Sequence, residues 1–176
     1  MIQFPLEQFA KTPTPFYYYD LDLLRTTLQS ISEQQKRYGY KVYYALKANS
    51  NPRLLNEIRL AGLGVDCVSG NEVQCALENG FDAQSIVFAG VGKADWEIQL
   101  ALDANIECFN VESLPELEVI NELAEKSNKV AVVALRINPN VDAHTHSYIT
   151  TGMEENKFGI GLWEVESVVK AIASMK

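Results

Sequence analysis

The sequence predicts an α/β fold built on a parallel sheet. Short runs rich in β-branched and aromatic residues alternate with amphipathic segments of helical length along most of the 176 residues. The first four runs begin roughly 20 residues apart, the length of a strand, a short loop and a helix. Hydrophobic residues make up 47% of the chain, which is enough for a core. Repeated units of this kind place parallel strands side by side with helices outside.

Five segments are expected to be strands because turn residues bound them on both sides. They are Val42–Leu46, Gly64–Val68, Ile86–Ala89, Glu107–Val111 and Val130–Ile137. The segments with helical periodicity are Asp20–Arg37, Pro52–Ala61, Asn71–Glu78, Asp95–Ala104, Pro115–Lys126 and Trp163–Met175.

The helix boundaries have their own signals. Ser69 with Glu72, and Ser113 with Glu116, have the Ser-x-x-Glu spacing of a capping box, which predicts a helix start at each serine. Residues that tolerate a left-handed backbone stand where three helices are expected to end, namely Gly62, Gly80 and Asn105.

The polar segment Asn138–Gly161 interrupts the alternation and contains both histidines, His144 and His146. Its length favours a functional loop or a lid over a plain connection. Two histidines in a His-x-His pattern, with no third histidine, are too few for a metal site. No bound metal is therefore expected.

Two architectures fit this pattern, a doubly wound open sheet and a (β/α)8 barrel. A barrel needs about eight strands in about 250 residues, and only five are predicted here. If the fold is a barrel, residues 1–176 are expected to be its N-terminal part, an incomplete TIM-type barrel with about five of eight parallel strands and outer helices.

Charge and cysteine content restrict the partners and the compartment. A formal net charge of −8 argues against nucleic acid and anionic membranes, because both require basic patches. The chain has no signal-peptide pattern and no apolar run near the ~20 residues of a membrane span. Cys67, Cys75 and Cys108 lack a Cys-x-x-Cys spacing and are expected to be reduced thiols. A cytoplasmic protein is therefore expected.

Lys47 directly follows the apolar run Val42–Leu46 and precedes the turn residues Asn49–Pro52. A desolvated lysine has a lowered pKa and becomes a nucleophile toward aldehydes, whereas a surface lysine past a strand end would have no such role. In a barrel, catalytic groups sit at the carboxyl ends of the strands, which is the position of Lys47. Lys47 is therefore a candidate catalytic residue.

Two further charged residues lie in or after apolar strands. Asp66 interrupts the strand Gly64–Val68, and it is either a group that tunes Lys47 or a turn aspartate. Arg136 ends the fifth strand, where it requires an anionic or polar partner, either a ligand or a structural carboxylate. The run Gly90–Lys93 lacks the full spacing of a P-loop and is interpreted as a turn.

Several segments together form a known pattern. They are Thr14–Asp20, Tyr44–Asn49 with Leu54, Leu55, Ile58 and Gly62 after it, Val65–Glu72, Arg136–Pro139, Thr150–Gly152 and Asn156–Ile160. This pattern resembles the alanine-racemase-like, fold-type III decarboxylases that depend on pyridoxal phosphate. The family includes ornithine, arginine and diaminopimelate decarboxylases, and the last three segments are more similar to the diaminopimelate branch.

The resemblance implies a fold, a cofactor and a reaction. The fold is the (β/α)8 barrel followed by a C-terminal β domain, in a protein that forms a homodimer. Lys47 would bind pyridoxal phosphate as a Schiff base, Asp66 would lie near the cofactor and substrate, and Arg136 would contact the cofactor's phenolic oxygen. The reaction would convert the amino acid meso-diaminopimelate to lysine and carbon dioxide. The 176 residues alone are expected to be inactive, because the phosphate-binding loops come later in the barrel.

Three alternatives remain open from the sequence. The substrate could be ornithine, arginine or carboxynorspermidine. The protein could bind pyridoxal phosphate in a regulatory role without catalysis. The chain could instead be a doubly wound domain that binds a phosphate ligand, although no glycine fingerprint supports this.

Overall fold

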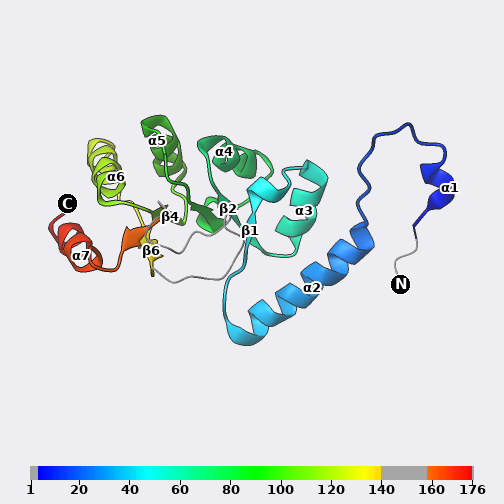
Figure 1. Cartoon of the computed structure of the whole chain (residues 1–176), viewed down its shortest axis with the longest axis horizontal. Helices are drawn as coiled ribbons and strands as arrows, with labels where there is room; N and C mark the ends of the chain where they lie inside the picture. Colours follow the sequence, from blue (N-terminus) through cyan, green and yellow to red (C-terminus); the bar gives the residue numbers. More distant parts are fainter. Residues whose placement is uncertain (1–3, 140–157, 176) are drawn as a thin grey trace.

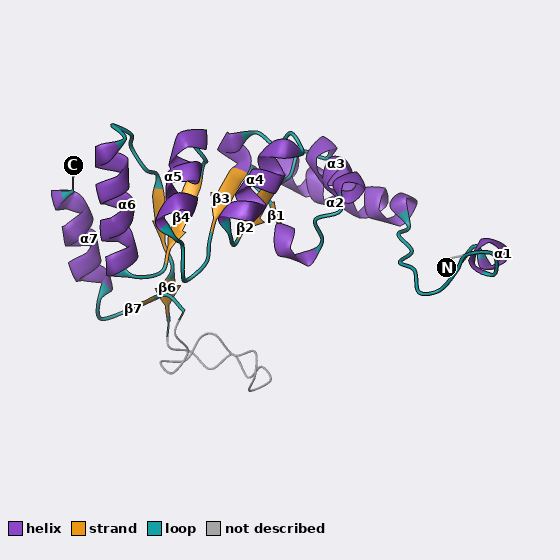
Figure 2. Cartoon of the chain, turned by 90° about the horizontal axis from the view of Figure 1, so that it is seen from above, coloured by secondary structure: helices purple, strands orange, loops and turns teal. Residues whose placement is uncertain are grey.

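The computed structural model describes residues 4–139 and 158–175. Its main sheet has five parallel strands in the order β1-β2-β3-β4-β5 (Figures 1 and 2). The strands are β1 (Tyr43–Ala45), β2 (Gly64–Cys67), β3 (Ile86–Phe88), β4 (Cys108–Val111) and β5 (Val133–Leu135). A doubly wound sheet reverses its winding direction near the middle, whereas a barrel places each strand beside its predecessor. The sequential order therefore excludes the doubly wound alternative and confirms the barrel-type α/β fold.

The helices follow the predicted alternation. They are α1 (Leu6–Phe9), α2 (Leu21–Tyr38), α3 (Pro52–Leu60), α4 (Gly70–Glu78), α5 (Asp95–Ala104), α6 (Leu114–Lys126) and α7 (Val165–Ser174), with short 3-10 turns η1 (Leu46–Ala48) and η2 (Ala83–Ser85). Helices α3 to α6 lie in a row along one side of the sheet in Figure 1, as the outer helices of a barrel do. Helix α1 lies apart from the sheet, beyond the start of α2.

The fifth strand is shorter than predicted. The run Val130–Ile137 was expected to be one strand, but β5 pairs with β4 only at Val133–Leu135. Val130 is 94% exposed. The apolar residues at the start of the predicted strand are therefore not a sign of burial in the sheet. After an interruption at Arg136, Ile137–Asn138 (β6) pairs in parallel with Ile160–Gly161 (β7) in a separate small sheet.

The two predicted capping boxes form with one difference. The hydroxyl oxygens of Ser69 and Ser113 accept the backbone N–H groups of Glu72 and Glu116, as expected. The glutamate side chains, however, accept the N–H of the residue before each serine instead of the serine's own, at 2.8 Å from Val68 N and 2.9 Å from Glu112 N. Left-handed residues follow the helices at the three predicted positions, Gly62, Gly80 and Asn105.

Alternation along the strands separates the core from the site. Val65 and Cys67 of β2 are fully buried in the cluster that packs against the helices, whereas Asp66 between them is only half-buried. The same alternation in β4 buries Phe109 and leaves Asn110 partly accessible. Successive side chains of a strand point to opposite faces, so Asp66 and Asn110 face away from the helices.

Two further expectations concern the chain as a whole. The three cysteines are free thiols, and among the described residues no helix is both long and apolar enough to span a bilayer. His144, His146 and the segment Thr150–Gly152 lie outside the described residues, as does Asn156 with Lys157.

Candidate active site

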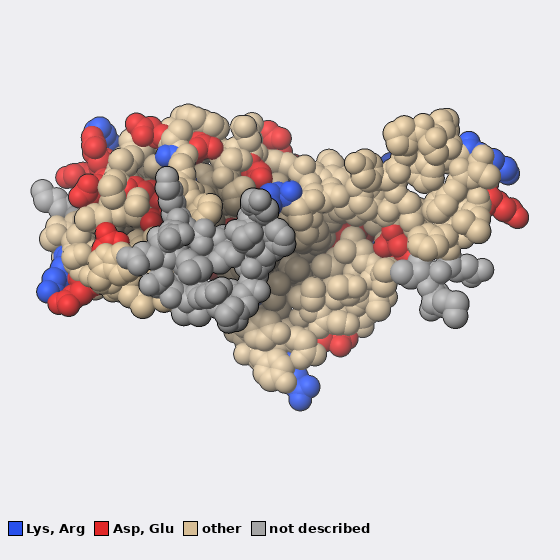
Figure 3. All heavy atoms as spheres, viewed as in Figure 1, with Lys and Arg blue, Asp and Glu red and all other residues tan. Residues whose placement is uncertain are grey.

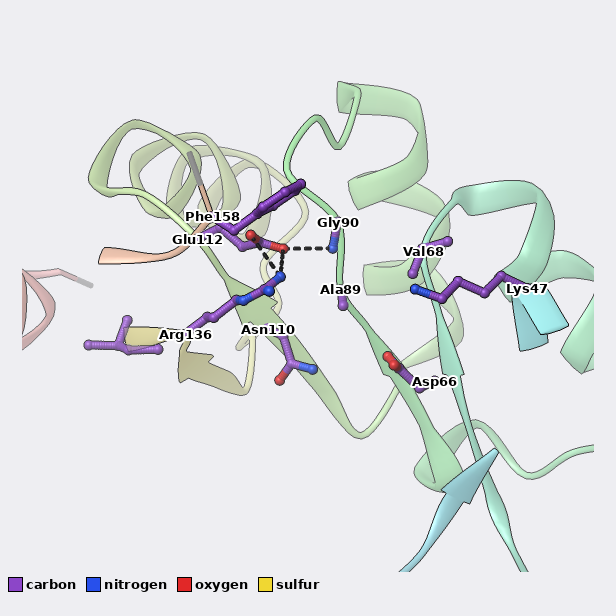
Figure 4. Close-up of a pocket in the computed structure, with 10 residues that line it drawn as sticks. Lys47, Asp66, Val68, Ala89, Gly90, Asn110, Glu112, Arg136 and Phe158 are labelled. Carbon is purple, nitrogen blue, oxygen red and sulfur yellow. Dashed lines mark hydrogen bonds and ion pairs between the residues drawn. The ribbon is translucent and has the colours of Figure 1, made fainter. Parts of the chain in front are cut away.

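A pocket of about 620 Å³ opens at the carboxyl ends of the strands. It is lined by Lys47, Asp66, Val68, Ala89, Gly90, Asn110, Glu112, Leu135, Arg136 and Phe158 (Figure 4). The three site residues predicted from the sequence therefore meet in one cavity. They lie in or just after β1, β2 and β5. They meet because parallel strands bring their carboxyl ends to one edge of the sheet.

Lys47 lies in η1, one residue beyond the buried Leu46 that follows β1. Its amine points into the pocket from the side opposite Arg136 and Glu112 (Figure 4). The Lys47 side chain was expected to be desolvated, but among the described residues it is exposed. The chain leaves β1 and enters η1 one residue before the lysine. The turn itself is held by the Tyr44 hydroxyl, which donates to the Asn49 carbonyl at 3.1 Å.

Asp66 projects from the middle of β2 into the pocket. Burial raises the pKa of its carboxyl, and the positive charges of Lys47, Arg136 and Lys93 oppose this shift without cancelling it. Its Oδ1 atom is buried, and no hydrogen-bond partner for it is found among the described residues. A buried oxygen without a partner is costly in free energy, so this atom is suited to accept a hydrogen bond from a ligand.

The variant Asp66→Asn is expected to stabilise the cofactor-free protein at neutral pH. The pKa of Asp66 lies above its ordinary value of 3.8 in the folded chain, so the folded state holds the proton to a higher pH than the unfolded state. The corresponding stability is complete below a pH of about 3.8 and is lost as the pH rises through the raised pKa. Asparagine does not titrate and avoids this loss.

Urea unfolding of the wild type and of Asp66→Asn between about pH 3 and pH 8 measures the effect. The advantage of the variant should grow as the pH rises from the acid end and then level off. A stability difference that stays constant over the whole range would contradict the role of burial at Asp66.

Arg136 follows β5 and interrupts the ladder between the two sheets. Its guanidinium Nη1 lies 3.1 Å from both carboxylate oxygens of Glu112, whose side chain is only 2% exposed. The guanidinium carbon also lies 5.2 Å from the ring centroid of Phe158, a cation–π contact. The sequence left two possible partners for Arg136, a ligand or a structural carboxylate, and Glu112 is such a carboxylate. Arg136 also lines the pocket.

Three charged residues near the pocket were not predicted from the sequence. Glu112 is part of the wall, and Lys93 with Glu116 forms an ion pair behind it whose side chains are 1% and 7% exposed. Glu116 was interpreted only as a capping residue and Lys93 only as part of a turn. The available signal was position. Glu112 directly follows β4, and Lys93 lies in the loop between β3 and α5, at the edge where Lys47 and Arg136 also lie.

The arrangement combines a primary amine, two further polar groups and space for a small ligand. A primary amine condenses with aldehydes, and a guanidinium binds anionic oxygen atoms. The unpartnered oxygen of Asp66 adds a hydrogen-bond acceptor. This set fits an aldehyde that also has an anionic oxygen. No cluster of metal-ligating side chains is found in residues 4–139 and 158–175.

Comparison with known proteins gives a consistent result. Residues 23–176 match the family model described as pyridoxal-dependent decarboxylase, pyridoxal binding domain. The chain is 57% identical over 174 residues to diaminopimelate decarboxylase of Bacteroides thetaiotaomicron, a match that covers 98% of this chain and 45% of that protein.

Solved structures agree with this match. Diaminopimelate decarboxylase from Helicobacter pylori, complexed with L-lysine, superposes with a TM-score of 0.87 at 42% identity, over 97% of this chain and 43% of that one. The enzyme from M. jannaschii gives a TM-score of 0.83 at 34% identity, over 98% of this chain and 42% of that one. The chain thus spans less than half the length of these relatives. It belongs to the pyridoxal-dependent decarboxylase family, and the match covers the pyridoxal-binding domain of that family.

Proposed function

We propose that the full-length protein is a pyridoxal-phosphate-dependent decarboxylase that converts meso-diaminopimelate to L-lysine and carbon dioxide. The observation that supports this most directly is the meeting of Lys47, Asp66 and Arg136 in one pocket. The assignment of the substrate is supported by relatives named diaminopimelate decarboxylase, one of which is 57% identical to this chain. Three of the similar structures contain L-lysine, the product of this reaction.

Each of the three residues has a proposed role. Pyridoxal phosphate, when bound, supplies an aldehyde that captures amines and a ring that accepts the electron pair left by a departing carboxylate. Lys47 would hold the cofactor through its Nζ atom and, once the substrate amine replaces it, would hold or deliver a proton at Nζ. The guanidinium of Arg136 would bind the phenolic oxygen of the cofactor. Asp66 would accept a hydrogen bond at Oδ1 and lie near both the cofactor and the substrate.

The larger assembly is also a proposal. Residues 1–176 would form the N-terminal part of a (β/α)8 barrel, completed by further strands and a C-terminal β domain in a homodimer. The main sheet of five strands and the coverage of less than half of each relative support this. The 176 residues alone are expected to be inactive, because they cover only part of a barrel.

The proposed surroundings are the cytoplasm, with small amino acids as ligands and no nucleic-acid or membrane partner. The net charge of −8 supports this. On the face seen in Figure 3, the described residues show acidic side chains and only scattered basic ones.

A substrate panel tests the proposed reaction. The full-length protein, loaded with pyridoxal phosphate, is assayed for carbon dioxide release from meso-diaminopimelate, ornithine, arginine and carboxynorspermidine. Release is expected to be at least about a hundredfold faster from meso-diaminopimelate, because a polar site rejects analogues that leave its groups unpaired. Faster release from another amino acid of the panel would assign the protein to a different branch of the decarboxylase family. Cofactor binding without release from any substrate would indicate a regulatory relative.

A further inference from the structure

Glu112 contacts the side chain of Arg136 in a way that can orient it. Its carboxylate accepts the backbone N–H of Gly90 at 3.1 Å and the Nη1 of Arg136 at 3.1 Å on each oxygen (Figure 4). The side chain is 2% exposed, whereas that of Arg136 is 40% exposed. A buried carboxylate requires a cation or several donors, so Glu112 and Arg136 are held together by the cost of separating them.

The backbone of Arg136 is fixed independently of its side chain. Its N–H donates to the Val111 carbonyl at 2.8 Å, and its carbonyl accepts the N–H of Ile160 at 2.7 Å. These bonds join the main sheet to the small sheet but leave the side-chain torsions of the arginine undetermined. An arginine side chain has many rotamers, and fixing one of them costs conformational entropy. Among the described residues, Glu112 and the ring of Phe158 limit this freedom.

Glu112 is itself anchored by the ion pair behind the wall. Its backbone N–H donates to Glu116 Oε2 at 2.9 Å, and Glu116 Oε1 accepts from Lys93 Nζ at 2.5 Å. Lys93 also donates to the carbonyl oxygens of Gly90 and Asn110, each at 2.9 Å. Lys93 and Glu116 do not line the pocket, so this pair fixes the wall, while the pair formed by Glu112 and Arg136 reaches the ligand space.

We propose that Glu112 is a positioning residue that holds the Arg136 guanidinium against the pocket, in the orientation that binds the anionic oxygen of the cofactor. This inference rests on the proposed cofactor function of the pocket. Both carboxylate oxygens of Glu112 contact the Arg136 guanidinium, so the effect of Glu112 on cofactor affinity is expected to pass through Arg136. Groups that orient a binding residue are needed to keep it within a few tenths of an ångström of its working position.

The test measures pyridoxal phosphate affinity in the full-length apoprotein by titration of the visible absorbance, with thermal unfolding recorded in parallel. Glu112→Gln removes the charge at nearly constant size. Glu112→Asp keeps the charge but withdraws the carboxylate by one methylene. Both variants are expected to weaken cofactor binding about tenfold, the effect of losing a charged hydrogen bond. The matched control is Glu118→Gln, on the exposed face of α6 and outside the pocket, which should bind as the wild type does.

A double-mutant cycle separates positioning from a structural role. Arg136→Lys keeps the charge but loses the guanidinium Nη1 that Glu112 contacts. In that background, Glu112→Gln is expected to weaken binding by less than about twofold, because residues that act as a unit are not additive. If Glu112 had a purely structural role, Glu112→Gln would lower the unfolding temperature, and the coupling free energy between Glu112 and Arg136 in cofactor binding would be zero.

Each result has a defined meaning. Wild-type affinity in both Glu112 variants, or a Glu112→Gln effect that is undiminished in the Arg136→Lys background, would overturn the positioning role. If Glu112→Gln does not fold, Glu112→Asp is carried through the same cycle. A wild-type protein that binds no pyridoxal phosphate would overturn the proposed function, and this inference with it.

Discussion

Replacing Lys47 by alanine is expected to abolish both decarboxylation and the visible absorbance of pyridoxal phosphate bound to the full-length protein. The Lys47 amine is the only lysine nitrogen among the residues that line the described pocket. Its loss would remove the proposed point of covalent attachment and the proposed proton carrier, so we expect a fall of about a thousandfold or more in kcat. Carbon dioxide release and an absorbance scan measure the two effects.

Lys41→Ala is the control for Lys47→Ala. Lys41 lies at the other end of β1, where it forms an ion pair with Glu107. We expect the Lys41 variant to keep both the absorbance and the activity, because strand starts in this fold contribute to stability instead of chemistry. Equal losses in the two variants, or normal absorbance without Lys47, would contradict the assignment.

Glu116→Gln is expected to destabilise the protein by about 3 kcal/mol or more. It leaves the Lys93 ammonium, whose side chain is 1% exposed, without its counter-charge. The chain provides a matched control, because Lys126 and Glu122 pair at the same 2.5 Å distance with side chains that are 64% and 63% exposed. An exposed pair contributes only about 0 to 1 kcal/mol, so Glu122→Gln should have little effect.

The free energy of unfolding from urea titrations decides this comparison. The result expected is a large difference between the two variants, caused mainly by burial, since the N–O distance and the residue types are the same in the two ion pairs. Similar losses in Glu116→Gln and Glu122→Gln would show that the wall behind the pocket is hydrated in solution.

The sequence predicted the strands and helices well where local signals were strong. The capping serines Ser69 and Ser113 located two helix starts, because a hydroxyl that accepts an N–H group works without tertiary context. The extent of β5 was predicted poorly. Val130 and Val132 have the composition of a strand but no partner in β4 at that level, and pairing depends on a neighbour that local sequence does not report.

The choice between the two architectures could not be made from spacing. Both consist of the same repeating units, and only the order of the strands in the sheet separates them. The resemblance to the decarboxylases indicated the barrel, and the sequential strand order agrees with it.

The residues of the site could be predicted where they lie at strand ends, because parallel strands end at one edge of the sheet. Lys47, Asp66 and Arg136 were found because each places a charge in or directly after an apolar run. The pairing of Glu112 with Arg136 could not be found in this way, since the two residues are 24 positions apart and meet only through the pairing of β4 with β5. The exposure of Lys47 was also missed, because η1 turns the chain within one residue of the strand.

Lys47 is proposed to condense with the aldehyde of pyridoxal phosphate. The most direct measurement is borohydride reduction of the cofactor-loaded full-length protein, followed by peptide mass mapping. We expect the phosphopyridoxyl mass on the peptide that contains Lys47, and on that lysine alone. A label on any other lysine, or no label on a protein that has bound the cofactor, would show that Lys47 does not form this bond.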